Sequence, residues 1–363
     1  MRWTDGLRLA PSVARSRLGA GWPFKLLLSL TDRCTHRCRH CRAWTRRPGE
    51  ELSPGEVGAL LDSVPGLRWL DLTGGEIVAR PDADALADAI AARSGRLVFL
   101  HFATNGDQPG KVGSFARRLR APGGPGLVVT VSLDGDRGLH DRIRGRRGAF
   151  DAAVRTARVL DAIPGVDVYV GTTVTPDNLD ALERTHDAIR EALPGLVPGR
   201  WHVNLMNRSR HFFGNLDVPA PSPDELLGAV DRIATLRGRP RDAFAVVERL
   251  FLLTLRGYLQ GGRPPAPCQA LRGSVFVGPT GDAYPCHVRD ACVGNVRETG
   301  CDLPRLLRAP RAVAERARIL GGPCAGCWTP CEAYPSMVAS PLATLAAALP
   351  AFARASSPRR VRP

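Results

Sequence analysis

Short apolar runs alternate with helix-like stretches along the first 206 residues of the chain. Runs rich in branched apolar residues are typical of buried strands, whereas apolar residues three and four apart are typical of helices with one buried face. The pattern predicts six strands, at residues 24–30, 67–72, 97–104, 127–133, 166–175 and 201–206. It predicts helices between them at residues 53–64, 82–93, 112–120, 149–162 and 179–193. Such alternation implies parallel pairing through right-handed crossovers, so the predicted fold class is α/β, a partial (β/α)6 barrel.

Beyond residue 207 the alternation stops. A Pro-rich break precedes two predicted helices, a β-hairpin around GPTGD, one further helix and an Ala/Leu-rich helix, at residues 223–236, 241–259, 274–285, 303–320 and beyond 340. We therefore expect a lead-in, a TIM-like barrel, a helical connector, a small cysteine-rich hairpin-plus-helix domain, and a C-terminal helix with a basic tail. Their expected bounds are 1–23, 24–218, 219–266, 267–340 and 341–363.

The chain carries 50 Lys and Arg against 35 Asp and Glu, a net charge of +15, and its arginines are scattered rather than striped. Scattered charge without an aromatic-rich basic module predicts no specific nucleic-acid partner, and leaves a polyanionic substrate or an acidic partner protein open. The chain has no apolar segment typical of a secretory signal and no run of about 18 apolar residues that could span a membrane. We expect a cytoplasmic protein whose thiols stay reduced.

Ten cysteines in a reduced chain favour metal or redox chemistry over a disulfide framework. Cys34, Cys38 and Cys41 lie within eight residues, directly after the first predicted strand. Three thiolates in one loop can converge on one metal centre. A zinc site would need a fourth ligand, which His36 or His40 could supply, whereas an iron–sulfur cluster on three cysteines leaves one iron open for a substrate or cofactor.

The segment CTHRCRHC resembles the CxxxCxxC signature of radical S-adenosylmethionine (SAM) enzymes, with His40 in the usual aromatic position. Further motifs of that family follow in its order, each at the end of a predicted strand or just after it: TGGE, ATNG, SLDG and HDRIRG, at residues 73–76, 103–106, 132–135 and 140–145. One departure is Ile77, which stands where the family has proline. The resemblance covers about residues 24–206.

This resemblance implies that Cys34, Cys38 and Cys41 hold a 4Fe–4S cluster, whose open iron binds SAM. It also implies SAM contacts from residues of the later motifs: Gly74, Gly75, Glu76, Asn105, Ser132, Asp134 and Arg144. A surface position for Arg144 and a turn-holding role for Asp134 stay open as alternatives.

The other seven cysteines all lie beyond residue 267. Five of them fit the patterns C-x12-G-x4-C and CxxCxxxC, which resemble the SPASM or twitch extensions that hold auxiliary 4Fe–4S clusters in radical SAM enzymes. We expect one auxiliary cluster on Cys268, Cys286, Cys324 and Cys327, with Cys331 competing for the fourth place. A second, partly ligated cluster and a zinc knuckle stay open. Cys292 and Cys301 are interpreted as free core cysteines.

The resemblance implies an enzyme that cleaves SAM reductively to a 5′-deoxyadenosyl radical and removes a substrate hydrogen, supplied with electrons by a flavodoxin or ferredoxin. Its substrate is either a ribosomally made peptide or a small sugar- or aminocyclitol-type metabolite, with the auxiliary cluster accepting an electron. A non-catalytic, metal-bound nucleic-acid-binding module is the third hypothesis. About 20 residues precede the first strand, so we expect no fused leader-peptide-binding domain. His202, Asn207 and His211 are candidates for substrate contact, with surface or capping roles equally open, and no general base stands out.

Overall fold

The structure, a computed structural model, describes residues 5–17, 23–120, 124–196, 199–238, 240, 243–261, 263–321, 324 and 327–355. The expected basic tail lies beyond residue 355, outside the described residues, as does the predicted helix start at residue 241.

The described strands form one open sheet in the order β6-β5-β4-β3-β2-β1-β7-β8-β9. The six strands of the predicted barrel are parallel, which confirms the α/β fold class. They are β1 (Lys25–Ser29), β2 (Trp69–Thr73), β3 (Phe99–Thr104), β4 (Leu127–Ser132), β5 (Val166–Val174) and β6 (Trp201–Leu205). The shorter strands that follow are β7 (Ser274–Val277), β8 (Asp282–Tyr284) and β9 (Gly294–Asn295).

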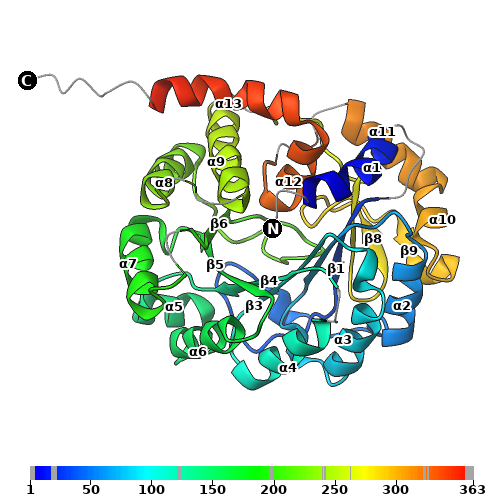
Figure 1. Ribbon diagram of the computed structural model, residues 1–363, viewed down its shortest axis with the longest axis horizontal. Helices are drawn as coiled ribbons and strands as arrows, with labels where there is room; N and C mark the ends of the chain where they lie inside the picture. The colour runs from blue at the N-terminus through cyan, green and yellow to red at the C-terminus, as the bar shows by residue number, and fades with distance from the viewer. Residues whose placement is uncertain are drawn as a thin grey trace, which may run out of the picture.

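Helices form an arc around the outside of the parallel sheet (Figure 1). This arc consists of α2 (Pro54–Asp62), α3 (Ala83–Ala91), α4 (Pro109–Leu119), α5 (Arg137–Arg144), α6 (Ala149–Asp161) and α7 (Leu182–Ala192). The remaining helices are α1 (Asp5–Arg17), α8 (Pro223–Leu236), α9 (Ala243–Gly261), α10 (Leu303–Leu307), α11 (Pro310–Gly321), α12 (Pro330–Ala339) and α13 (Pro341–Ala355). Short 3-10 turns lie at Ala43–Thr45, Ile77–Ala79, Ser94–Arg96, Leu179–Ala181 and Val296–Thr299. No helix among the described residues has both the length and the apolar character that a bilayer span requires.

Alternation along the strands separates two faces of the sheet. Leu26 and Leu28 of β1 pair in register with Leu70 and Leu72 of β2, and all four belong to the main hydrophobic core with residues of α2 and α3. Successive side chains of a strand point to opposite faces, so the alternate positions face the barrel interior. In β1 and β2 those positions include the polar residues Lys25, Ser29, Asp71 and Thr73.

The hairpin of the cysteine-rich region is not separate from the barrel sheet. Strand β7 pairs in parallel with β1, with Lys25 opposite Ser274 and Leu28 opposite Val277, and β8 and β9 continue the sheet as antiparallel strands. Nothing local in the sequence marks this pairing, because it joins strands about 250 residues apart in a 363-residue chain. The two cysteine regions are therefore carried by one sheet.

Several elements differ from the sequence prediction. The helix expected at residues 303–320 is two helices, α10 and α11, because Pro310 has no N–H to donate and disfavours helical geometry in the residue before it. Helix α4 starts at Pro109, three residues before the predicted start, with proline at its first position. Helices α1, α5 and α12 and strand β9 were not predicted. All three helices have 13 residues or fewer, and for such short segments tertiary packing outweighs local propensity.

Candidate functional site

The first cysteine loop lies against the glycines that end β2. Gly75 N–H donates to the Thr31 carbonyl at 2.8 Å, and Glu76 N–H donates to the Arg33 carbonyl at 2.7 Å. A Cβ on Gly75 would lie 2.1 Å from the Arg33 oxygen, and one on Gly74, where φ is +137°, would lie 2.5 Å from the Thr31 oxygen. Only glycine permits this approach. The GGE segment therefore shapes the loop that carries the thiols.

Of the three cysteines in the first loop, Cys38 is buried, and Cys34 and Cys41 are half-buried. Burial raises the pKa of Cys34 to about 12 and that of Cys41 to about 11, and it also raises the pKa of Cys38. Each of Cys34 and Cys41 is close enough to Cys38 for the thiols to oppose one another's ionisation. Asn105 Nδ2 lies 3.8 Å from the Cys34 sulfur, and Arg144 Nη1 lies 3.8 Å from the Cys38 sulfur. Buried thiolates need a cation beside them, so this donor set fits iron.

Arg144 is buried, with 7% of its surface exposed, and the surface position considered from the sequence is wrong. Its Nη2 lies 2.7 Å from Asp134 Oδ2, and Asp134 Oδ1 accepts from Thr173 N–H at 2.9 Å. Although burial opposes ionisation of Asp134, the Arg144 guanidinium holds its pKa below the ordinary range. Ser132 ends β4 two residues before this carboxylate and is half-buried. The buried ion pair thus places a positive charge beside the first cysteine loop.

Glu76 is buried and connects the ends of β2 and β3. Its two carboxylate oxygens accept from Thr104 Oγ1 at 2.9 Å and from Asn105 N–H at 2.7 Å. Burial raises the pKa of Glu76 to about 7. Each oxygen keeps a further lone pair, so an ammonium group arriving here would find an acceptor and would lower that pKa.

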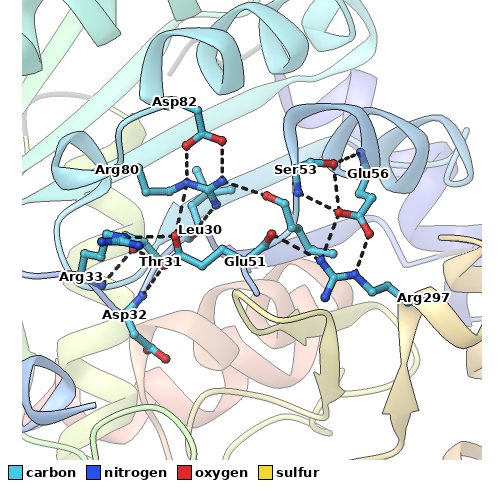
Figure 2. A network of polar contacts seen from close by, with 11 residues as sticks. Leu30, Thr31, Asp32, Arg33, Glu51, Ser53, Glu56, Arg80, Asp82 and Arg297 are labelled. Carbon is cyan, nitrogen blue, oxygen red and sulfur yellow. Dashed lines mark hydrogen bonds and ion pairs between the residues drawn. The ribbon is translucent and has the colours of Figure 1, made fainter. Parts of the chain in front are cut away.

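Glu51 supports the start of the first cysteine loop (Figure 2). Thr31 Oγ1 donates to Glu51 Oε1 at 2.5 Å, and Asp32 N–H lies 3.3 Å from the same oxygen. Arg80, which is 6% exposed, donates to the Leu30 carbonyl at 2.6 Å and lies 3.7 Å from Glu51 Oε2. The end of β1 is therefore held by a buried arginine and carboxylate that are far from it in sequence.

Arg297 connects this support to the cysteine-rich region (Figure 2). Its Nε donates to Glu56 Oε1 at 2.6 Å, and its other nitrogens donate to the carbonyls of Glu50 and Glu51 at 3.0 and 3.3 Å. Glu56 also belongs to the capping box that begins α2 on Ser53. One arginine thus joins the segment after β9 to the helix next to the first cysteine loop.

The second group of cysteines converges from three chain segments. Burial raises the pKa of Cys268 and of Cys286 well above the ordinary thiol range. Nearby Cys327 and Cys324 raise the pKa of Cys268 further, and Cys327 and Cys268 do the same for Cys286. Backbone amides already face two of the sulfurs: Ala270 N–H lies 3.4 Å from Cys268 Sγ, and Arg289 N–H lies 3.3 Å from Cys286 Sγ. Mutually close, buried thiols with amide donors fit an iron–sulfur cluster.

Cys331 lies on the barrel side of this group. Burial raises its pKa to about 12, and the charged neighbours that act on it most strongly are Lys25 and Asp71. Lys25 Nζ donates to the Cys331 carbonyl at 2.5 Å and lies 2.9 Å from Asp71 Oδ2. Among the described residues, no three Cys, His, Asp or Glu side chains are grouped as ligands of a single metal ion. Of the other two cysteines, Cys301 belongs to the hydrophobic core as expected, and Cys292 is half-buried.

Polar residues of the barrel interior were missed by the sequence analysis. Lys25 and Asp71 stand alone among apolar neighbours in β1 and β2, a pattern that could have identified them. His101 Nδ1 lies 3.3 Å from Asp71 Oδ1, and its Nε2 lies 2.9 Å from Thr130 Oγ1. Trp69 Nε1 donates to Asp71 as well, at 2.9 Å. The carboxylate therefore links three strands inside the barrel.

The three residues considered for substrate contact each have a partner within the chain. His202 Nδ1 lies 2.9 Å from the buried Glu248 carboxylate, and Asn207 donates to the Leu205 carbonyl at 3.0 Å. His211 is bound to Asp290, and its side chain is 6% exposed.

Two family models match the chain in the regions of the two cysteine sites. Residues 28–189 match the model described as the radical SAM superfamily. Residues 268–328 match the SPASM model, described as an iron–sulfur cluster-binding domain.

Curated proteins with related sequences include two enzymes that are similar over most of this chain. An AdoMet-dependent heme synthase of Oleidesulfovibrio alaskensis is 28% identical, over 74% of this chain and 71% of its own length. The mycofactocin maturase MftC of Mycolicibacterium smegmatis is 27% identical, over 87% of this chain and 78% of its own length. Streptococcus suis SuiB, solved with bound S-adenosylmethionine, has a TM-score of 0.58 and 16% identity, and the match covers 85% of this chain and 71% of that one. At that identity, the likeness to SuiB shows the fold.

Proposed function

The chain belongs to the radical SAM superfamily and carries a SPASM iron–sulfur domain, and from this premise we propose that it matures a ribosomally made peptide. Its cofactors are a SAM-binding 4Fe–4S cluster, SAM and an auxiliary iron–sulfur cluster. Together the first cluster and SAM supply a 5′-deoxyadenosyl radical, which removes a hydrogen atom from the substrate.

The residues of the first loop supply the binding site in this proposal. Cys34, Cys38 and Cys41 bind three irons, and the backbone at Gly75 keeps the loop closed against β2. Glu76 accepts the SAM ammonium group, which would complete the hydrogen bonding of its buried carboxylate. Arg144 offsets the negative charge of the thiolates from the side of Cys38. The roles of Ser132 and Asn105 as further SAM contacts are part of the same proposal.

For the auxiliary cluster we propose four ligands from the SPASM region: Cys268, Cys286, Cys324 and Cys327. Their support is that each of Cys268 and Cys286 lies near other members of this set. Cys331 is instead assigned to the barrel interior, because its carbonyl and thiol lie beside Lys25. A cluster with four protein ligands has no open iron, which suits electron transfer rather than substrate binding.

The observation that carries the peptide assignment is the similarity to the mycofactocin maturase across 87% of this chain. The test is to reconstitute the protein anaerobically and incubate it with SAM, dithionite and synthetic peptides encoded beside its gene. We expect 5′-deoxyadenosine together with a peptide that has lost hydrogen, detected by mass spectrometry. SAM cleavage that no such peptide stimulates would contradict the peptide assignment and leave the enzyme class intact.

The similarity to an AdoMet-dependent heme synthase favours a small molecule as the second candidate substrate. In that case the auxiliary cluster would accept an electron during oxidation of a metabolite. Stimulation of 5′-deoxyadenosine formation by a small metabolite, and not by peptides, would distinguish the two candidates.

For the electron donor we propose a flavodoxin or ferredoxin. The net charge of +15 supports an acidic partner, because complementary charge accelerates association. Salt should then slow flavodoxin-driven turnover more than dithionite-driven turnover.

A further inference from the structure

A loop after β6 contacts both cysteine sites. This segment, residues 207–217, is called the bridge loop here. Three residues of the first cysteine loop bind it: His40, Arg42 and Arg46. Asn215 donates to the His40 carbonyl at 2.7 Å, and Arg42 N–H donates to the Phe213 carbonyl at 2.8 Å. The Arg46 guanidinium donates to two further carbonyls of the bridge loop.

On its other side, the bridge loop binds the segment that follows Cys286. Asp290 accepts from Arg210 N–H at 2.9 Å and from His211 N–H at 2.8 Å, and it lies 2.6 Å from His211 Nδ1. His211 Nε2 lies 3.0 Å from the Cys286 carbonyl, and its ring stacks on Tyr284 at 4.1 Å. Both partners of the ring are acceptors, so the imidazolium form holds both ends of residues 286–290, whereas the neutral ring donates to one of them.

The segment held in this way also carries an amide aimed at a sulfur. Arg289 N–H lies 3.3 Å from Cys286 Sγ, between the two points that His211 holds. Hydrogen bonds to ligand sulfurs stabilise the more negative, reduced state of a cluster and so raise its reduction potential. The direction of this amide therefore depends on a side chain that lies outside the SPASM match, which starts at residue 268.

We propose that His211 is a positioning residue for the auxiliary cluster. It fixes residues 286–290 so that Arg289 N–H bonds the Cys286 sulfur, and through the bridge loop it ties that segment to the first cysteine loop. The inference rests on the proposed function, in which Cys286 is a cluster ligand. If so, changing His211 should change the reduction potential of the auxiliary cluster, although His211 is not one of the proposed cluster ligands.

The test uses the full chain with Cys34→Ala, Cys38→Ala and Cys41→Ala, so that only the auxiliary cluster remains. Three further variants are made in that background: His211→Phe, His211→Gln and His186→Phe. The phenyl ring keeps the stacking on Tyr284 without polar contacts, whereas the glutamine keeps an amide donor. His186 is the matched control, because it lies on α7 with its ring against Trp201, away from the bridge loop. Iron content and the midpoint potential from EPR-monitored redox titration are measured for each.

We expect about four irons per chain in the background protein, as one cluster requires. His211→Phe should shift the midpoint to a more negative potential, His211→Gln should shift it less, and His186→Phe should leave it unchanged. If His211→Phe holds a full cluster with an unchanged midpoint potential, the role of His211 is overturned, while the proposed function still stands. If His211→Phe fails to hold iron, His211→Gln is the test: a more negative midpoint potential supports the role of His211, and an unchanged one overturns it. A background protein without iron would overturn the auxiliary cluster itself, and with it this role of His211.

Discussion

The two cysteine sites of this protein are built in opposite ways. The first takes its three thiols from eight consecutive residues after β1, whereas the second gathers thiols from segments that start at Cys268 and end near Cys327. A short loop can be shaped by its own backbone and one neighbouring strand end. A site from distant segments exists only when the sheet, the bridge loop and α12 are in place. The first site should therefore tolerate damage to the second.

The largest effect is expected when the first site is removed. We expect no 5′-deoxyadenosine from the triple variant Cys34→Ala, Cys38→Ala and Cys41→Ala, because no open iron remains to bind SAM. Iron content should fall by about half, since the auxiliary cluster is held elsewhere. The control is Cys292→Ala, which lies outside both proposed ligand sets. It should retain both 5′-deoxyadenosine formation and the full iron content. SAM cleavage that survives the triple change would contradict the assignment.

The next comparison tests whether Cys331 belongs to the ligand set of the auxiliary cluster. Cys286→Ala should lose the auxiliary iron, because it removes a ligand that already receives an amide hydrogen bond. Cys331→Ala should retain that iron, since its neighbours are Lys25 and Asp71. Iron analysis and the visible spectrum near 400 nm measure both. Loss of the auxiliary iron in Cys331→Ala would place Cys331 among the ligands.

A smaller change tests how the first loop is shaped. Gly75→Ala would put a methyl group 2.1 Å from the Arg33 carbonyl oxygen, so the loop must move, at a cost of about 1–3 kcal/mol in unfolding free energy. Iron should be lost from the first site and kept at the second. Gly95→Ala is the matched control, because its Cβ would meet no atom within 4 Å. Equal iron loss from both sites in Gly75→Ala would show that the sites are not independent.

The smallest effect concerns the link between the two regions. The hydrogen bond from Arg297 lowers the pKa of Glu56 to about 2, below the 4.5 of an ordinary glutamate. A depressed carboxylate pKa stabilises the fold above the unfolded pKa, and this contribution disappears as pH falls from about 4.5 to about 2. Glu56→Gln should therefore cost less than about 1 kcal/mol at pH 7, with the difference vanishing in acid.

Chemical unfolding measures the loss of unfolding free energy in Glu56→Gln, with Glu225→Gln as the control. Glu225 has the same capping box, on Ser222 at the start of α8, and the contacts that lower its pKa come from Ser222 alone. Its substitution should cost less than that of Glu56. An equal cost would mean that Arg297 adds nothing beyond the cap.

Much of the barrel could be predicted because its signals are local. Each of the six strands is an apolar run, and the capping box of α2 is visible in Ser53 and Glu56. The support of Glu51 by Arg80 could not be predicted, since neither residue lies in a motif and their contact depends on how the β1 and β2 ends meet. The partner of His211 could not be predicted either, because Asp290, which it contacts, lies 79 residues further along the chain.

The sequence by itself determined the chemistry of this protein: the spacing of Cys34, Cys38 and Cys41, the GGE segment and the order of strands and helices. These features depend on neighbours within a few residues, so they are readable along the chain. Only the tertiary structure decided that β7 joins β1, that Lys25 binds the Cys331 carbonyl, and that the bridge loop connects both cysteine sites. Those contacts join residues tens to hundreds of positions apart, and they form because packing in three dimensions satisfies the hydrogen bonds of buried backbone and charge.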